Sequence, residues 1–275
     1  MLESSLLLAR PGLASFLPEP AIIAVISDIH ANLEALTRVL DDIASQEIRD
    51  IICLGDLVGY GPDPAACVDL AMGWRVVLLG NHDEATLTEA FGFNPVARDA
   101  LNWTREQLQP GFLSFGKKRA RWEFLKARPR THEELDTLFV HASPRDPTME
   151  YILRSDTEDI TGGVPEKIRD IFTRFPRVCM IGHTHDPGII TEESRFLAPA
   201  DVGDAYTFPP GRKFIVNVGS VGQPRDGDPR ACYVVYDGAT LRYRRVEYDK
   251  QATLAKIRNI PQLDPRVGER LLHGR

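Results

Sequence analysis

Five short polar motifs in the sequence carry residue types that bind metal ions or transfer protons. In chain order they are Asp28-Ile29-His30, Gly55-Asp56, Gly80-Asn81-His82-Asp83, His141 and Gly182-His183-Thr184-His185. They contain five of the seven histidines of the chain. Imidazole nitrogens mixed with carboxylate and amide oxygens suit Mn²⁺, Fe or Zn²⁺ and would make a poor site for Ca²⁺. The motifs therefore predict a transition-metal site, provided that the fold brings them together.

Each motif follows a short apolar run that is typical of a buried strand. These runs cover residues 21–26, 51–54, 75–79, 135–140 and 178–181. Apolar residues at helical spacing separate the first three runs, over 33–43 behind an Asn32 N-cap and over 62–72. This alternation predicts a mostly parallel sheet with right-handed crossovers. Ligands of such sheets bind at the carboxyl ends of the strands, where all five motifs lie.

The composition is that of an ordinary globular enzyme, with 275 residues, 43% hydrophobic and 26% charged. The net charge of -6 argues against indiscriminate binding to nucleic acid or to an anionic membrane. No stretch is long and apolar enough to span a membrane. Four dispersed cysteines without a CxxC pair predict reduced thiols in a cytoplasmic protein. Residues 1–20 lack a basic leader and predict a poorly ordered N-terminal extension rather than a signal peptide.

The rest of the chain predicts further helices and strands. Residues 84–135 are expected to be helical, with His132 as a surface or capping residue, and a helix is expected over 165–175 after a loop. Strands are expected over 214–218, 231–236 and 241–246, with a tight turn at Asp237-Gly238, followed by a helical tail over 251–275. The basic stretch 117–130 suggests either a nucleic-acid patch or a solvated helix face with Phe124 and Leu125 turned inward. We favour the solvated face.

The ordered set D-x-H, G-D, G-N-H-D, H and G-H-x-H resembles the calcineurin-like metallophosphoesterase superfamily. The motifs span residues 28–185, and the expected strands extend the domain to 21–248, with 249–275 as a helical tail. The resemblance implies a four-layer α/β/β/α sandwich with two mixed β-sheets and a centre of two divalent ions (Mn, Fe, Zn or Ni). It implies that the first metal is held by Asp28, His30 and His185, the second by Asn81, His141 and His183, with Asp56 bridging.

The resemblance also implies a mechanism. A hydroxide bound between the metals would attack phosphorus, because coordination lowers the pKa of water to ~7. In the family the histidine of G-N-H-D is not a ligand, which leaves His82 as the general acid that protonates the departing alkoxide. Asp83 would then hold the imidazole of His82 in orientation.

One position distinguishes branches of the superfamily. Phosphatases of the G-D-x-x-x-R-G type carry an arginine where this chain has Tyr60. Loss of that guanidinium removes a clamp on a dianionic phosphate, which favours phosphodiesters over monoesters. The stretch 217–225 is similar to one in small prokaryotic phosphodiesterases; its Arg225 is either a substrate contact or a solvated residue beside Asp226.

Several functions remain open on the sequence. We expect a metal-dependent phosphodiesterase acting on a small phosphodiester or nucleotide in the cytoplasm, without a membrane partner. The alternatives are a phosphomonoesterase or protein or nucleotide phosphatase, a nuclease guided by the basic stretch 117–130, and a non-catalytic scaffold such as the retromer subunit of the superfamily. Because all the expected ligands are intact, the scaffold is the weakest of these.

Overall fold

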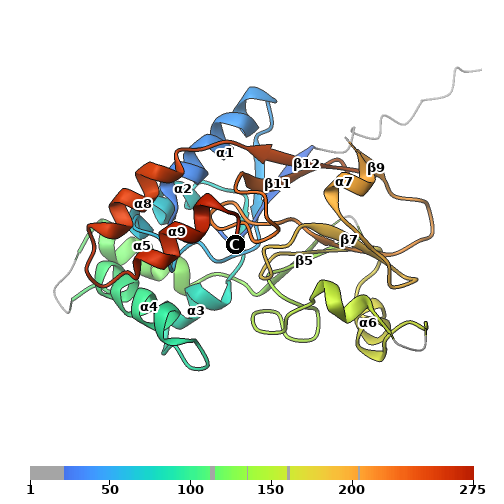
Figure 1. Ribbon diagram of the computed structural model, residues 1–275, viewed down its shortest axis with the longest axis horizontal. Helices are drawn as coiled ribbons and strands as arrows, with labels where there is room; N and C mark the ends of the chain where they lie inside the picture. The colour runs from blue at the N-terminus through green and yellow to red at the C-terminus, as the bar shows by residue number, and fades with distance from the viewer. Residues whose placement is uncertain (1–21, 112–114, 135, 160–161, 204) are drawn as a thin grey trace, which may run out of the picture.

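The computed structural model describes residues 22–111, 115–134, 136–159, 162–203 and 205–275. The strands form two six-stranded mixed β-sheets with helices packed outside them, which confirms the predicted fold class (Figure 1). The predicted N-terminal extension, residues 1–20, lies outside the described residues. No helix in the described part of the chain is long and apolar enough to cross a membrane.

The first sheet has the strand order β3-β2-β1-β11-β12-β9. Strands β1 (Ile23–Ile26), β2 (Asp50–Cys53) and β3 (Val76–Val77) are mutually parallel, as the sequence predicted. Strands β11 (Ala231–Tyr236), β12 (Thr240–Val246) and β9 (Tyr206–Thr207) complete the sheet in antiparallel pairing. The predicted turn at Asp237-Gly238 joins β11 to β12.

The second sheet has the strand order β4-β5-β6-β10-β7-β8. Strands β5 (Thr137–Val140), β6 (Val178–Ile181) and β10 (Phe214–Asn217) are parallel. The outer strands β4 (Thr131–Glu134), β7 (Gly188–Thr191) and β8 (Phe196–Leu197) pair antiparallel with their neighbours. The prediction that residues 84–135 are helical was wrong for β4, because pairing with β5 decides the conformation of these residues.

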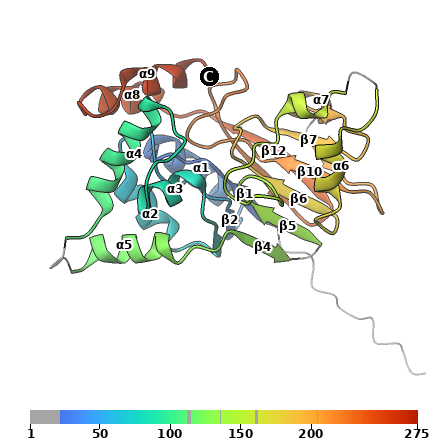
Figure 2. The ribbon, with the colours of Figure 1, turned by 90° about the horizontal axis from the view of Figure 1, so that it is seen from below.

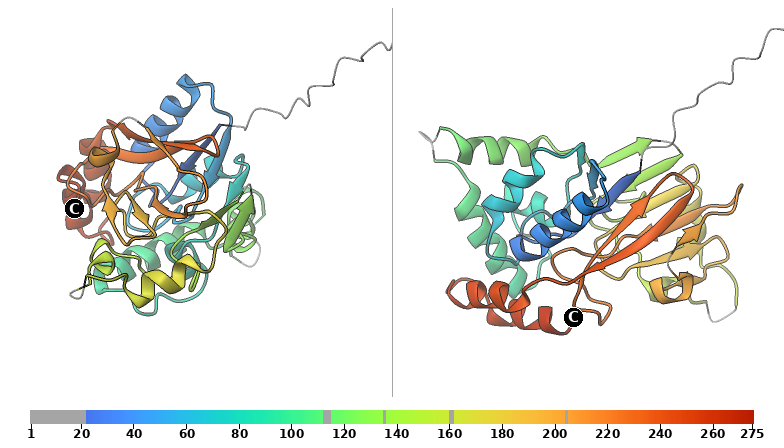
Figure 3. Two further views of the ribbon diagram at one scale, coloured as in Figure 1. Left: turned by 90° about the vertical axis from the view of Figure 1, so that its right-hand side faces the viewer. Right: turned by 90° about the horizontal axis from the view of Figure 1, so that it is seen from above.

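Helices cover the outer faces of both sheets (Figure 2). On the first sheet lie α1 (Leu33–Ser45) and α2 (Pro64–Ala71); on the second lies α6 (Glu166–Phe172). The other helical segments are α3 (Asn81–Leu87), α4 (Pro95–Leu108), α5 (Lys117–Lys126), η1 (Arg154–Thr157), α7 (Pro199–Val202), α8 (Lys250–Arg258), α9 (Pro265–Glu269) and η2 (Arg270–Leu272). Helix α8 packs on α1, which brings the end of the chain back beside its first helix (Figure 3).

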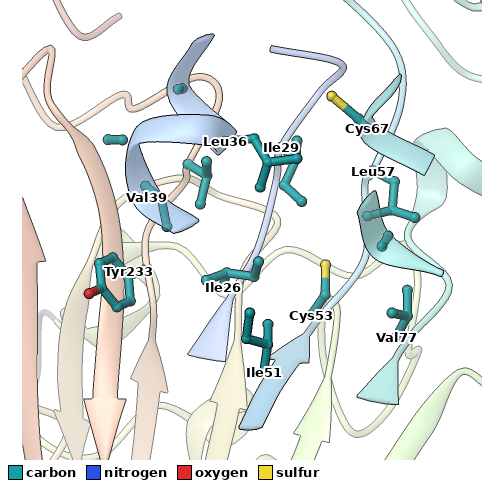
Figure 4. Packing of buried hydrophobic residues seen from close by; sticks show 14 of the residues in the cluster. Ile26, Ile29, Leu36, Val39, Ile51, Cys53, Leu57, Cys67, Val77 and Tyr233 are labelled. Carbon is teal, nitrogen blue, oxygen red and sulfur yellow. The ribbon is translucent and has the colours of Figure 1, made fainter. Parts of the chain in front are cut away.

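The period of two along a strand separates the core into layers. In β1, Ile23 and Val25 pack between the two sheets, whereas Ala24 and Ile26 face the helices. Figure 4 shows the helix side of this arrangement, where Ile26 lies near Leu36 and Val39 of α1. The continuous apolar runs of the sequence therefore reflect burial on both faces of each sheet.

The structure shows the surroundings of the cysteines, of the basic stretch in α5 and of His132. The four cysteines are buried and free, as predicted. On α5, Leu125 is buried and Phe124 packs partly against the core, and Arg121 forms an exposed ion pair with Asp69 (Nη2–Oδ2 2.6 Å). His132 lies partly buried in β4 with its Nε2 3.1 Å from Glu134 Oε2.

Candidate metal centre

The seven predicted metal ligands converge at the carboxyl ends of strands from both sheets. They follow β1, β2, β3, β5 and β6, so that both sheets contribute to one site. None of them is more than 5% exposed: Asp28, His30, Asp56, Asn81, His141, His183 and His185. Polar side chains are rarely buried so densely unless they bind one another or an ion. The convergence that the sequence pattern required is therefore present in the fold.

The first group of donors consists of Asp28, His30 and His185. His185 Nε2 lies 3.1 Å from His30 Nε2 and 3.2 Å from Asp28 Oδ1. The Nδ1 atoms of the two imidazoles donate to backbone carbonyls, His30 to Val58 O (3.3 Å) and His185 to Gln223 O (2.5 Å). In the neutral rings both Nε2 atoms therefore direct lone pairs at each other. A cation between them would relieve that repulsion, and the two carbonyls fix the rings in the orientation that ligation needs.

The second group consists of Asn81, His141 and His183. His141 Nε2 lies 3.0 Å from Asn81 Oδ1, and the rings of His141 and His183 are 4.9 Å apart. His183 Nε2 donates to Met149 O (3.3 Å), which leaves its Nδ1 as the free nitrogen.

Asp56 stands between the two groups. Its Oδ2 is 3.4 Å from His141 Nε2 and 3.7 Å from His30 Nε2. This position, within reach of one imidazole from each group, is the one expected of a bridging carboxylate.

Five of the seven predicted ligands have a left-handed backbone, which non-glycine residues rarely adopt. Their φ angles run from 49° to 64°, and they are Asp28, His30, Asp56, His183 and His185. Such a conformation costs about 1–2 kcal/mol per residue and tends to cluster at functional sites. Here these residues follow the ends of three strands, β1, β2 and β6. Residue types and spacing carried no signal of this conformation.

The glycines inside the motifs are required by close packing between the motifs. A Cβ on Gly80 would lie 2.0 Å from Asp56 Oδ1, and one on Gly182 would lie 2.4 Å from Asp28 Oδ2. Real Cβ atoms do not approach other atoms so closely. Each glycine therefore lets the backbone of one motif pass directly beside a carboxylate of another.

Electrostatics keep the two carboxylates ionised. Burial would raise the pKa of Asp28, but His185 outweighs it and holds the pKa below its ordinary value. Burial alone would lower the pKa of His141, but the carboxylate of Asp56 outweighs burial and raises that pKa to about 9. A cation at the site would have to displace the proton of His141, because only a neutral imidazole binds a metal, whereas the ionised carboxylates can bind one directly.

His82 lies beside the two groups of ligands. Its ring contacts those of His30, Tyr60 and Phe93 at centroid distances of 4.7, 4.6 and 5.0 Å, and its Nδ1 has no hydrogen-bond partner. Its backbone N–H donates to Asp56 Oδ1 (2.8 Å), and burial lowers the pKa of its imidazole to about 4. A ligand atom of His82 also lies within 4.8 Å of ligand atoms of His30 and Asp56, so distance alone does not separate an acid from a ligand.

The prediction that Asp83 orients the imidazole of His82 was wrong, because Asp83 binds backbone N–H groups instead. Both carboxylate oxygens accept backbone N–H groups, Oδ1 from Val58 (3.2 Å) and Oδ2 from Gly80 (3.1 Å). No hydrogen bond joins Asp83 to the imidazole of His82 in the described structure. The carboxylate sits at the start of α3, where free N–H groups compete successfully for it. Asp83 therefore holds the backbone of two motifs together.

A pocket opens over these residues and adds side chains that the sequence did not single out. Its lining includes Phe93 and Tyr151 besides Tyr60, His82 and Arg225. Tyr151, from the loop before η1, stacks on His183 with ring centroids 3.9 Å apart. Nothing in the sequence singled out Tyr151 except its position in a long predicted loop.

Arg225 is not paired with its neighbour Asp226, which instead accepts from Arg245. Arg225 Nη2 donates to Gln223 Oε1 (2.7 Å), and its buried Nε has no hydrogen-bond partner. Of the two predicted environments, the structure thus places Arg225 at the pocket.

Two mixed six-stranded sheets with a buried His/Asp centre at their strand ends define a protein of the metallophosphoesterase type. The sequence profile of the calcineurin-like phosphoesterase family matches residues 22–187. An uncharacterised protein of Methanocaldococcus jannaschii is 36% identical over 267 residues, 93% of this chain and 99% of that protein. The chain therefore belongs to the calcineurin-like phosphoesterase family.

Two further comparisons agree. The crystal structure of a metallophosphoesterase from Sphaerobacter thermophilus is 35% identical, with a TM-score of 0.76 over 92% of this chain and 99% of that one. A symmetrical bis(5'-nucleosyl)-tetraphosphatase of an Acidovorax species is 36% identical over 127 residues, 42% of each chain.

The donor set fits the divalent metals that this family uses. Asp28 Oδ1 is buried without a hydrogen-bond partner, and so is His141 Nδ1. Buried unpaired oxygen and nitrogen atoms are costly in a protein interior, and a bound cation is one way to offset that cost at Asp28.

Proposed function

We propose that the protein is a two-metal phosphodiesterase. The observation that carries this proposal is the burial of seven donors in one cluster beneath a pocket that has Tyr60 at the position where phosphatases of the superfamily carry an arginine. We take residues 21–248 as the catalytic unit and 249–275 as a tail attached to it. The buried free thiols favour a cytoplasmic protein.

The proposed ligands follow the two groups of donors. Asp28, His30 and His185 would hold the first ion, Asn81, His141 and His183 would hold the second, and Asp56, which lies between the two groups, would be shared by both. Divalent ions such as Mn, Fe, Zn or Ni would lower the pKa of a coordinated water and neutralise charge on the phosphoryl oxygens. The protein itself orients the ligands through Val58, Gln223 and Met149 carbonyls.

His82 is the proposed general acid. Its ring lines the pocket beside the proposed ligands. A negatively charged ester in the pocket would favour the protonated imidazole and so offset the effect of burial. The imidazole can then deliver a proton to the leaving oxygen, which is the transfer that an alkoxide leaving group requires.

Tyr60 is the residue that favours a diester. Its ring contacts both His30 and His82, at 5.0 and 4.6 Å, so that an aromatic face stands where a phosphatase would present a guanidinium. A diester has one negative charge fewer than a monoester dianion and needs less positive charge from the protein. The second candidate is a nucleotide phosphatase, favoured by the similarity to the symmetrical tetraphosphatase.

The deciding experiment compares bis-p-nitrophenyl phosphate with p-nitrophenyl phosphate, using chelator-stripped protein to which Mn²⁺ is returned. Metal-dependent preference for the diester is the expected result. Preference for the monoester would reject the diesterase and favour the phosphatase. Two bound metals without turnover of either ester would favour a scaffold.

The acid role of His82 is tested by leaving-group chemistry. His82→Ala should retain both metals, measured by elemental analysis, and should lose turnover mainly with esters of poor leaving groups. A nitrophenolate needs little protonation, so its release should be affected much less. Loss of metal, or equal loss with both kinds of ester, would contradict the assignment.

The nuclease is less favoured than the diesterase. It requires the basic stretch 117–130 to guide a strand to the metals, and no residue of that stretch lines the described pocket.

A further inference from the structure

An arginine near the end of the chain, Arg270, lies close to Tyr60, which lines the pocket. Arg270, in η2, directs Nη1 to Gln223 Oε1 (3.3 Å), and its guanidinium carbon lies 5.6 Å from the centre of the Tyr60 ring. Tyr60 is the position where a phosphatase of the superfamily would carry arginine. Arg270 therefore places a guanidinium near Tyr60, the position that is an arginine in those phosphatases.

Arg270 and Arg225 share one acceptor. Both donate to the same amide oxygen, Gln223 Oε1, at 3.3 and 2.7 Å. Two guanidinium groups held on one neutral oxygen repel each other, and each remains charged at any physiological pH. In the described part of the chain no carboxylate lies within ion-pair distance of either group.

Neighbouring arginines of the tail are different. Arg258 pairs with Glu269 (3.0 Å), and Arg266 pairs with Asp264 (2.5 Å). Of the three arginines in α8, α9 and η2, Arg270 is therefore the one without a carboxylate partner among the described residues. An anionic ligand would supply the missing negative charge.

Gln223 connects this arginine pair to the proposed metal site. Its carbonyl accepts the hydrogen bond from His185 Nδ1, and the backbone N–H of Arg225 donates to His185 O (3.2 Å). Gln223 is only 1% exposed, so the connection is rigidly packed. Arg225 also lines the pocket together with Asp56 and His82. A group bound by the two arginines would therefore lie next to the phosphorus that reacts.

We propose that Arg225 and Arg270 bind a second phosphate group of the substrate, adjacent to the phosphate that is cleaved. This inference rests on the proposed phosphodiesterase function and narrows its substrate to diesters that bear a further phosphate, such as phosphoanhydride-linked nucleotides. Phosphate suits the site because guanidinium groups present parallel N–H donors to its oxygens, and each phosphate of a polyphosphate chain brings one negative charge to the two arginines.

The first test measures binding without catalysis. Inorganic pyrophosphate is titrated calorimetrically into chelator-treated protein carrying Arg270→Gln, Arg270→Lys or the control Arg266→Gln. Arg270→Gln should weaken binding about tenfold, the order expected for one lost charge-assisted contact, and Arg270→Lys should weaken it less. Arg266→Gln should bind like the wild type, because its guanidinium already has Asp264. Equal affinities of Arg270→Gln and Arg266→Gln would overturn the proposal.

The second test uses turnover. With Mn²⁺ present, Arg270→Gln should raise KM about tenfold for diadenosine tetraphosphate and leave that for bis-p-nitrophenyl phosphate, which has no second phosphate, within about twofold. Equal changes for both substrates would overturn the inference while leaving the diesterase intact. Absence of all turnover would reject the diesterase, and the calorimetric result would then decide the anion site alone. Thermal unfolding of each variant identifies any loss of folding.

Discussion

Asp83→Ala tests the assignment in which the structure departs most from the sequence. The carboxylate is fully buried and accepts the N–H groups of Val58 and Gly80 at 3.2 and 3.1 Å. Its removal leaves both donors without a partner, and each buried unsatisfied donor costs about 1–3 kcal/mol. Burial, aided by the charge of Asp56, raises the pKa of Asp83 to about 8. This cost of burying the carboxyl group offsets part of the stability that its two hydrogen bonds contribute. We therefore expect a loss of about 2–3 kcal/mol in the free energy of unfolding.

Thermal and guanidinium unfolding measure this loss. For a domain of this size, about 2–3 kcal/mol corresponds to a fall in Tm of roughly 4–12 °C. Asp83→Asn keeps one carbonyl acceptor and should lose about half as much. The matched control is Asp41→Ala, an exposed carboxylate 2.9 Å from Arg38, which should change stability by less than about 0.5 kcal/mol.

The competing role of Asp83, orientation of His82, predicts a different pattern. If Asp83→Ala unfolded like Asp41→Ala yet lost turnover of poor leaving groups as His82→Ala does, our structural assignment would be refuted. A large fall in Tm, largely restored in Asp83→Asn, would support it.

Three other perturbations have expected outcomes. Gly182→Ala should lower metal content and stability, because its Cβ would lie 2.4 Å from Asp28 Oδ2. The control Gly73→Ala, whose Cβ would have its nearest atom at 3.9 Å, should retain both. Equal effects of the two substitutions would contradict the close-packing argument. Returning Mn²⁺ to stripped protein should raise the free energy of unfolding by about 2.7 kcal/mol for each occupied site at a hundredfold excess over its Kd, and an unchanged Tm would argue against a metal site. Partial burial would raise the pKa of Asp42, but the hydrogen bond from Arg244 outweighs it and lowers that pKa. The ionised Asp42 should therefore stabilise the fold by about 0.5–1 kcal/mol above pH ~4, and this contribution should be lost as the pH falls through the lowered pKa of the folded state. Asp42→Asn should remove this pH dependence when stability is measured in an acid titration.

Local patterns predicted the parts of the fold that depend on local properties. The runs before Asp28, Asp56 and Asn81 are continuous and apolar because their strands are buried on both faces, and Asn32 caps α1 through the N–H of Ala35 (3.1 Å). Strands β7, β8 and β9 were missed. Strands β7 and β9 pair with strands distant in the sequence, β10 and β12, and the short length of all three strands gives little periodicity.

The sequence by itself determined which residues could bind metal and that they would meet, because five motifs at five strand ends must share one edge of the layered sheets. Only the tertiary structure decided the contacts of individual atoms. It gave Asp83 to two backbone N–H groups, stacked Tyr151 on His183, and brought Arg270 to Gln223 beside the pocket. Such contacts join segments far apart in the chain, so their distances are set by the packing of whole helices and sheets, and no local pattern encodes them.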